Sequence, residues 1–130
     1  MPFPTTLEFI VEAENHLGVQ LPESFRTHLL ASNGGEVDVE DDTWQVYPVF
    51  DKSDRKHIAR TANHIVYETK QARSWPGFPV QAVAIADNGS GDKLVFLPGA
   101  PDAKQLGSAV HLWDHETRET SVVAEDFNQL

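Results

Sequence analysis

The sequence contains no cysteine and only one methionine in 130 residues. The absence of cysteine excludes a disulfide scaffold, a thiolate nucleophile and a zinc site with cysteine ligands. No apolar run reaches the roughly 18 residues that a membrane-spanning helix needs. Residues 1–6 have neither a basic segment nor an apolar core, so we expect no secretory signal. These absences together predict a cytoplasmic protein that makes no use of a membrane.

Basic residues are also scarce, and they are unevenly placed. The chain has 20 acidic and 10 basic residues, which gives a formal net charge of −10. Residues 52–73 hold six of the bases and only two acids, so the rest of the chain carries 18 acids against four bases. A chain of this kind is repelled by phosphate backbones, which argues against binding to nucleic acid. It attracts a basic partner, and its electric field raises the rate of encounter.

Apolar residues at helical spacing predict three helices. A capping box formed by Thr5 and Glu8 opens the first helix, in which Leu7, Ile10, Val11 and Leu17 form the apolar stripe. The second helix begins at Pro22 and ends at Asn33-Gly34-Gly35, where positive φ angles are tolerated. The third helix is longer and runs from a Ser53 cap to Arg73.

The remaining apolar segments predict about five strands, at 44–49, 80–86, 93–97, 109–113 and 120–124. A strong turn signal, 88–91, joins the second of these to the third, and residues 98–107 form a longer loop. The connections are short and hairpin-like, which favours antiparallel pairing. We therefore expect one α+β domain over residues 1–130, with an antiparallel sheet of about five strands packed by about three helices.

Three local patterns are similar to chemical sites, and each fails a test of spacing. Residues 87–92 lack the oxygen ligands that an EF-hand requires at its third and fifth positions. His111, Asp114 and His115 straddle a strand end and a turn, so their spacing does not aim them at one metal ion. Ser90 is not flanked by glycines at the distance that a nucleophile elbow requires. We predict no catalytic residue, no cofactor and no metal ligand.

The stretch 36–42 carries five acids in seven residues, interrupted by two valines. Alternation would place Glu36, Asp38 and Glu40 on one face of a strand. Such charges protect an edge strand from aggregation, or they form a docking surface for a basic protein. We predict a protein interface at Glu36, Asp38, Glu40, Asp41, Asp42 and Trp44. For Trp44, a place in the core is the alternative, as it is for Trp75 and Trp113.

Five motifs occur in an order that resembles the SUKH superfamily, which includes the Smi/Knr-type cell-wall regulators. They are residues 21–35 with a Leu-Pro pair and Asn-Gly-Gly, the Trp strand 44–48, the Gly-x-Gly-Asp turn within 85–92, the Trp-Asp-His-Glu ending of 110–116, and Ala-x-x-Phe at 124–127. Together they span nearly the whole chain. The chain departs from the pattern at Leu130, because any helix after Phe127 must be very short.

The resemblance implies a non-enzymatic binding module. Many bacterial SUKH domains are immunity proteins that neutralise a toxin, often a nuclease with a basic surface, and this role agrees with the acidic composition. The alternatives are a Smi/Knr-type regulatory scaffold that binds endogenous proteins, and an uncharacterised hydrolase or metal-dependent enzyme. The partner's identity, the face that binds it and the oligomeric state are left open.

Overall fold

The computed structural model describes residues 2–99 and 104–130. Within this part, six strands form one antiparallel sheet whose spatial order, β1-β2-β3-β4-β5-β6, is also the order along the chain. The strands are β1 (Glu36–Val39), β2 (Asp42–Val46), β3 (Val83–Asp87), β4 (Lys93–Phe96), β5 (Val110–Trp113) and β6 (Thr120–Ala124). The predicted α+β fold is confirmed. The sheet has one strand more than expected, because the acidic stretch forms the edge strand β1.

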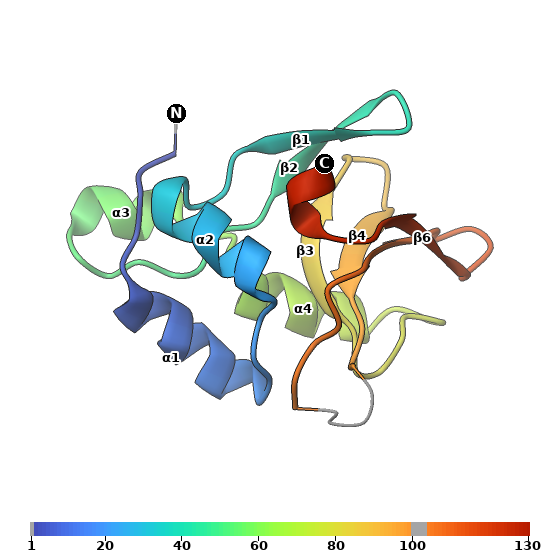
Figure 1. Cartoon of the computed structure of the whole chain (residues 1–130), viewed down its shortest axis with the longest axis horizontal. Helices are drawn as coiled ribbons and strands as arrows, with labels where there is room; N and C mark the ends of the chain where they lie inside the picture. The colour runs from blue at the N-terminus through green and yellow to red at the C-terminus, as the bar shows by residue number, and fades with distance from the viewer. Residues whose placement is uncertain (1, 100–103) are drawn as a thin grey trace.

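The helices lie across the sheet and to one side of it (Figure 1). They are α1 (Leu7–Leu17), α2 (Glu23–Ala31), α3 (Arg55–Arg60), α4 (Ile65–Arg73) and the 3-10 helix η1 (Phe127–Gln129). On one face, Phe25 of α2 meets Phe96 of β4 and Phe127 of η1 edge to face, with ring centroids 5.4 and 4.9 Å apart. The helix α4 packs against β3, where the Thr69 hydroxyl accepts a hydrogen bond from the Ala84 amide at 3.0 Å. The buried apolar residues of the helices and of the sheet form one core cluster.

The start of α1 differs from the prediction. The helix begins one residue after Thr6, which makes no side-chain capping bond. Thr5 is buried, and its hydroxyl donates to Asp51 Oδ2 at 3.0 Å, so it is used in a contact between distant segments of the chain and not in a capping box. The inward face also differs, because Phe9, Ile10 and Ala13 are buried whereas Leu7 is 50% exposed.

The predicted third helix is two helices, α3 and α4. At the break, the buried Thr61 hydroxyl donates to the His57 carbonyl and accepts from the Asp51 amide, at 2.8 and 3.0 Å. The His64 ring then caps α4 by accepting from the Tyr67 amide at 3.3 Å. Side chains that bond to nearby backbone compete with helix continuation, which explains the break. The cap of α3 is Asp54 and not Ser53.

The three tryptophans differ in burial. Trp44 and Trp113 are each 1% exposed, in agreement with a place in the core. Trp75 is 38% exposed, so the alternative of a place in the core does not hold for this residue. It lies after α4 and covers Trp113 from outside, with ring centroids 6.0 Å apart. The loop predicted at 98–107 includes residues 100–103, which lie outside the described residues.

Candidate functional site

The predicted acidic interface lies on the hairpin of β1 and β2, which extends from the body of the domain (Figure 1). Glu40 and Asp41 form its turn with φ angles of 51° and 69°. Positive φ at both central residues gives the turn whose twist matches that of the paired strands. All five acids of the stretch are exposed to solvent. The hairpin therefore presents a concentrated negative charge at one edge of the sheet.

The acids do not share one face as predicted. Glu36 and Asp38 alternate along β1 and lie on the same face, where Asp38 Oδ1 accepts from the Thr43 hydroxyl at 3.0 Å. Glu40 lies in the turn, and Asp42 pairs with Val39, so Asp42 lies on the opposite face of the ribbon. The charge surrounds the tip of the hairpin, because the turn comes earlier than a continuous strand would allow.

Trp44 is not part of this exposed surface. It lies opposite Val37 in the ladder, is 1% exposed, and its indole Nε1 donates to the Val39 carbonyl at 3.3 Å. The alternative of a place in the core is therefore the one that the structure supports. Trp44 holds the two strands of the hairpin together from the inside, so the exposed residues among those predicted as an interface are the five acids.

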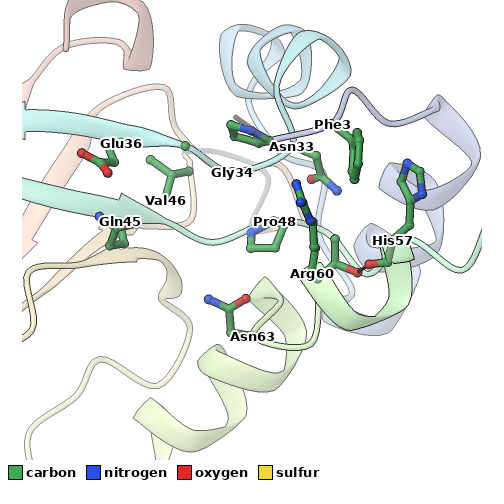
Figure 2. A pocket seen from close by; sticks show the side chains of 13 residues that line it. Phe3, Asn33, Gly34, Glu36, Gln45, Val46, Pro48, His57, Arg60 and Asn63 are labelled. Atoms are coloured by element: carbon green, nitrogen blue, oxygen red, sulfur yellow. Dashed lines mark hydrogen bonds between the residues drawn. The ribbon is translucent and has the colours of Figure 1, made fainter. Parts of the chain in front are cut away.

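A cavity of about 550 Å³ lies at the base of the hairpin, beside the end of α2 (Figure 2). Buried Asn33 shapes it by joining three segments. Its backbone amide donates to the Phe3 carbonyl at 2.9 Å. Its side chain donates to the Val49 carbonyl at 3.0 Å and accepts from the Val49 amide at 2.9 Å. The next residue, Gly34, has a φ of 122°, and a Cβ there would lie 3.3 Å from the Val46 carbonyl oxygen. The Asn-Gly motif thus builds the floor of the cavity as well as ending α2.

Replacing Asn33 tests this arrangement. Asn33→Ala leaves both backbone polar groups of Val49 without their partner in a buried place, so we expect a loss of about 2–3 kcal/mol in the free energy of unfolding. The measurement is urea denaturation of the parent and the variant. Asn128→Ala is the control, because Asn128 is exposed and should change stability by less than about 0.5 kcal/mol. Equal losses in the two variants would contradict the role given to Asn33.

The wall of the cavity opposite the hairpin consists of aromatic and cationic side chains. The Phe3 ring stacks on His57 with centroids 4.4 Å apart, and the Arg60 guanidinium lies 4.7 Å from the centre of the same ring. Figure 2 shows Phe3, His57 and Arg60 on one side, Glu36 and Gln45 on the other, and Pro48 between them. A cavity with one acidic and one basic wall was not predicted from the sequence. Finding it required knowing that α3 returns to the start of the chain.

His115 forms an ion pair with Asp92, which lies 23 positions earlier in the chain. Asp92 Oδ1 lies 2.6 Å from His115 Nδ1 and also accepts from the His115 amide at 3.1 Å. Ligand-type atoms of these two residues and Asp114 lie within 4.8 Å of one another. His111 is not part of this cluster, so the structure does not bring together the trio considered from the sequence. The contact joins the 88–91 turn to the turn after β5. The Gly-Asp motif at 91–92 and the Asp-His motif at 114–115 therefore have a structural role, which is to hold these two turns together.

The pair makes stability depend on pH. The hydrogen bond to Asp92 raises the pKa of His115 above its ordinary value of 6.5. Burial opposes ionisation of Asp92, but hydrogen bonds from the ring and the amide of His115 and from the Asn88 side chain outweigh it and lower the pKa of Asp92 below 3.8. The His115 contribution is present below about pH 6.5 and is lost as pH rises through the raised pKa. The Asp92 contribution is present above about pH 4 and is lost as pH falls through the lowered pKa.

We therefore expect the His115 ring to titrate above pH 6.5 and to move back toward that value in Asp92→Asn. Histidine-ring NMR titration measures the midpoints. His111 serves as an internal reference, because burial lowers its pKa and its midpoint should lie below 6.5 in both proteins. A His115 midpoint that is unchanged by the substitution would show that Asp92 does not set it.

A second polar cluster, also not predicted, lies under Trp75. The Lys93 ammonium is buried, donates to the Tyr47 hydroxyl at 2.6 Å and lies 4.0 Å from Asp87 Oδ2. The Tyr47 hydroxyl in turn donates to Asp87 at 2.6 Å. Burial, followed by the bond to Asp87, raises the pKa of Tyr47 far above its ordinary range. Each polar group of the cluster has a partner. The buried charge of Lys93 is therefore compensated by the Tyr47 hydroxyl and the Asp87 carboxylate.

None of the helices formed by residues 2–99 and 104–130 is long and apolar enough to cross a membrane. No curated protein sequence is similar enough to this chain to count as a match. The SMI1/KNR4 family (SUKH-1), in contrast, has a family model that matches residues 4–130, which is nearly the whole chain. The match includes the helix that ends in Asn-Gly-Gly, the acidic hairpin and the residues that line the cavity other than Pro2 and Phe3. The chain belongs to the SMI1/KNR4 family (SUKH-1).

Proposed function

We propose that this domain is a non-enzymatic, protein-binding immunity protein, and that it neutralises a cognate toxin through its acidic hairpin. The observation that carries the proposal is the exposure of all five acids around the tip of β1 and β2. Edge protection alone needs fewer charges than this. Because the turn places acids on both faces of the ribbon, the tip can enter a basic cleft and meet cations on either side.

A nuclease toxin is the partner whose chemistry fits this surface best. Nucleases bind phosphate backbones through clusters of lysine and arginine. A hairpin that carries closely spaced carboxylates imitates a phosphate backbone electrostatically and competes for the same cations. The net charge of −10 adds a long-range attraction that raises the association rate.

The experiment is a protection assay in cells that express the toxin encoded beside this chain's gene. Co-expression of the parent should restore growth, and the toxin should co-purify with the domain. A domain that fails to protect against that toxin contradicts the proposal. Capture of endogenous proteins alone, without the toxin, would support a regulatory scaffold. Metal in the purified protein, with an activity that chelation removes, would support an enzyme.

A further inference from the structure

Arg60 has no carboxylate partner in the described parts of the chain, although acids outnumber bases there. Lys52 Nζ lies 2.7 Å from Glu12 and Arg26 Nε lies 3.3 Å from Glu14. Arg60 makes no such pair within the described residues, and in this it is like other exposed cations such as Lys56. Arg60 is exposed, lies at the end of α3 and lines the cavity at the base of the hairpin. What distinguishes Arg60 is its place in the cavity lining, where its guanidinium is available to a carboxylate from outside the domain.

The position of Arg60 is defined in spite of its exposure. Its guanidinium lies over the Phe3 ring. The His57 ring stacks on the same Phe3 ring and limits its movement. The Phe3 backbone is in turn fixed by the hydrogen bond from the Asn33 amide. A guanidinium that rests on an aromatic ring keeps its N–H groups free at the edge, where they can pair with a carboxylate in two parallel hydrogen bonds.

The opposite wall carries the complementary chemistry. Glu36 is exposed at the start of β1, and Gln45 lies opposite it in the ladder. Neither the Gln45 amide nor the Asn63 amide makes a side-chain hydrogen bond within residues 2–99 and 104–130, and both line the cavity. Free amides that face a cavity can pair with the N–H and C=O groups of a peptide backbone. The cavity thus offers a carboxylate, a guanidinium and two side-chain amides that can form hydrogen bonds with a peptide backbone.

We propose that this cavity binds an extended peptide segment of the protein partner, with an Asp or Glu of that segment on Arg60 and a Lys or Arg on Glu36. The proposal rests on the proposed function only in taking the partner to be a protein. A peptide fits better than a drug-like small molecule, because small-molecule sites are lined mainly by apolar and aromatic side chains. Here Asn33, Glu36, Gln45, His57, Arg60, Thr61 and Asn63 contribute about half of the lining.

The probe is a capped hexapeptide, Lys-Ser-Gly-Gly-Ser-Glu, together with its reversed sequence. Each peptide is titrated into isotope-labelled protein, and the backbone amide shifts of Gly34, Gly35 and Asn63 are followed by NMR. One of the two orders should shift these amides. Arg60→Gln should weaken that binding by up to about fivefold, the upper end of the range for an exposed ion pair. The same peptide with Gln in place of Glu should bind the parent as weakly as the original peptide binds Arg60→Gln.

Lys56→Gln is the matched control. Lys56 also lies over Phe3, at 5.6 Å, but does not line the cavity, so its loss should leave the affinity unchanged. Thermal melting of both variants checks that the fold is intact. Arg60→Glu should regain affinity for a peptide with Lys in place of Glu, because the charges are then exchanged.

Three results would overturn the proposal. The first is the absence of shifts at the cavity with either peptide at millimolar concentration. The second is an equal loss of affinity in Arg60→Gln and Lys56→Gln. The third is equal binding of N-acetylglutamate alone, which would indicate a site for a small anion. None of them bears on protection from the toxin through the hairpin, and a failure to protect would leave the peptide titration interpretable.

Discussion

Trp113→Ala should lower the free energy of unfolding by about 3–5 kcal/mol, the range for truncating a buried aromatic side chain. Trp113 is 1% exposed and meets Phe78 edge to face, with ring centroids 5.1 Å apart. Its indole Nε1 also donates to the Gly77 carbonyl at 3.2 Å. The substitution leaves a cavity beneath the loop after α4 and removes the group that holds this loop against the sheet. Urea denaturation measures the loss, and the dependence of the unfolding free energy on urea concentration should be the same in the parent and the variant.

Trp75→Ala is the matched control, because it removes the same side chain from the neighbouring position outside the core. Trp75 is 38% exposed, so we expect a smaller loss of about 1 kcal/mol. Trp113→Phe should fall between the two, since it keeps an aromatic ring but loses the hydrogen bond to Gly77. A Trp113→Ala protein that melts within a degree or two of the parent would contradict the burial and would make Trp113 a candidate for binding.

Burial of Trp113 could be predicted from the sequence only in part. Alternation along residues 110–113 places Trp113 on the face opposite Val110 and Leu112, and a Trp at a strand end can be covered by a neighbouring helix or loop. The structure confirms the cover, which comes from residues after α4. Which residues provide it depends on where the third predicted helix ends and on the packing of distant segments. The sequence pattern carried no information on that packing.

The elements themselves were more predictable than the contacts that fix their ends. The strands β3 to β6 follow from β-branched runs between turn residues, and the expected positions differ from the observed ones by only a few residues. The break between α3 and α4 was missed because the helical spacing of apolar residues continues through it. Thr61 ends α3 by bonding to Asp51, a contact that local propensity does not include.

In the candidate site, too, some residues could be predicted from the sequence and others could not. The five acids could be found as a local run of charge, and their exposure agrees with the prediction. The cavity could not be found in this way, since its walls come from residues as distant in sequence as Phe3, Glu36 and Arg60. A possible signal was the basic character of residues 52–73 in an acidic chain, which indicates a second surface without showing what lies beside it.

Neutralising the hairpin should slow association with a basic partner by about tenfold to a hundredfold, with little effect on dissociation. The variant changes Glu36 and Glu40 to Gln, and Asp38, Asp41 and Asp42 to Asn. Its stability should hardly change, because exposed charges contribute little to folding and like charges at the tip repel one another. Association kinetics with the captured toxin, measured at two salt concentrations, test the expectation.

Salt provides the second measure of the same effect. The parent should associate more slowly as salt rises, since the Debye length falls from about 30 Å at 0.01 M to about 10 Å at 0.1 M. The five-site variant should show a weaker dependence, because fewer charges of the hairpin remain to be screened.

The matched control removes five exposed acids elsewhere, Glu8, Glu23, Glu116, Glu119 and Glu125, by substitution with Gln. Both variants change the net charge equally, so net charge alone would slow association equally in both. We expect the control to lose much less, because the field of a concentrated patch is strongest where the partner docks. Equal slowing in the two variants would mean that the whole domain attracts the partner. Unchanged rates and unchanged salt dependence in the hairpin variant would remove this hairpin from the interface and leave the cavity wall around Arg60 as the next surface to test.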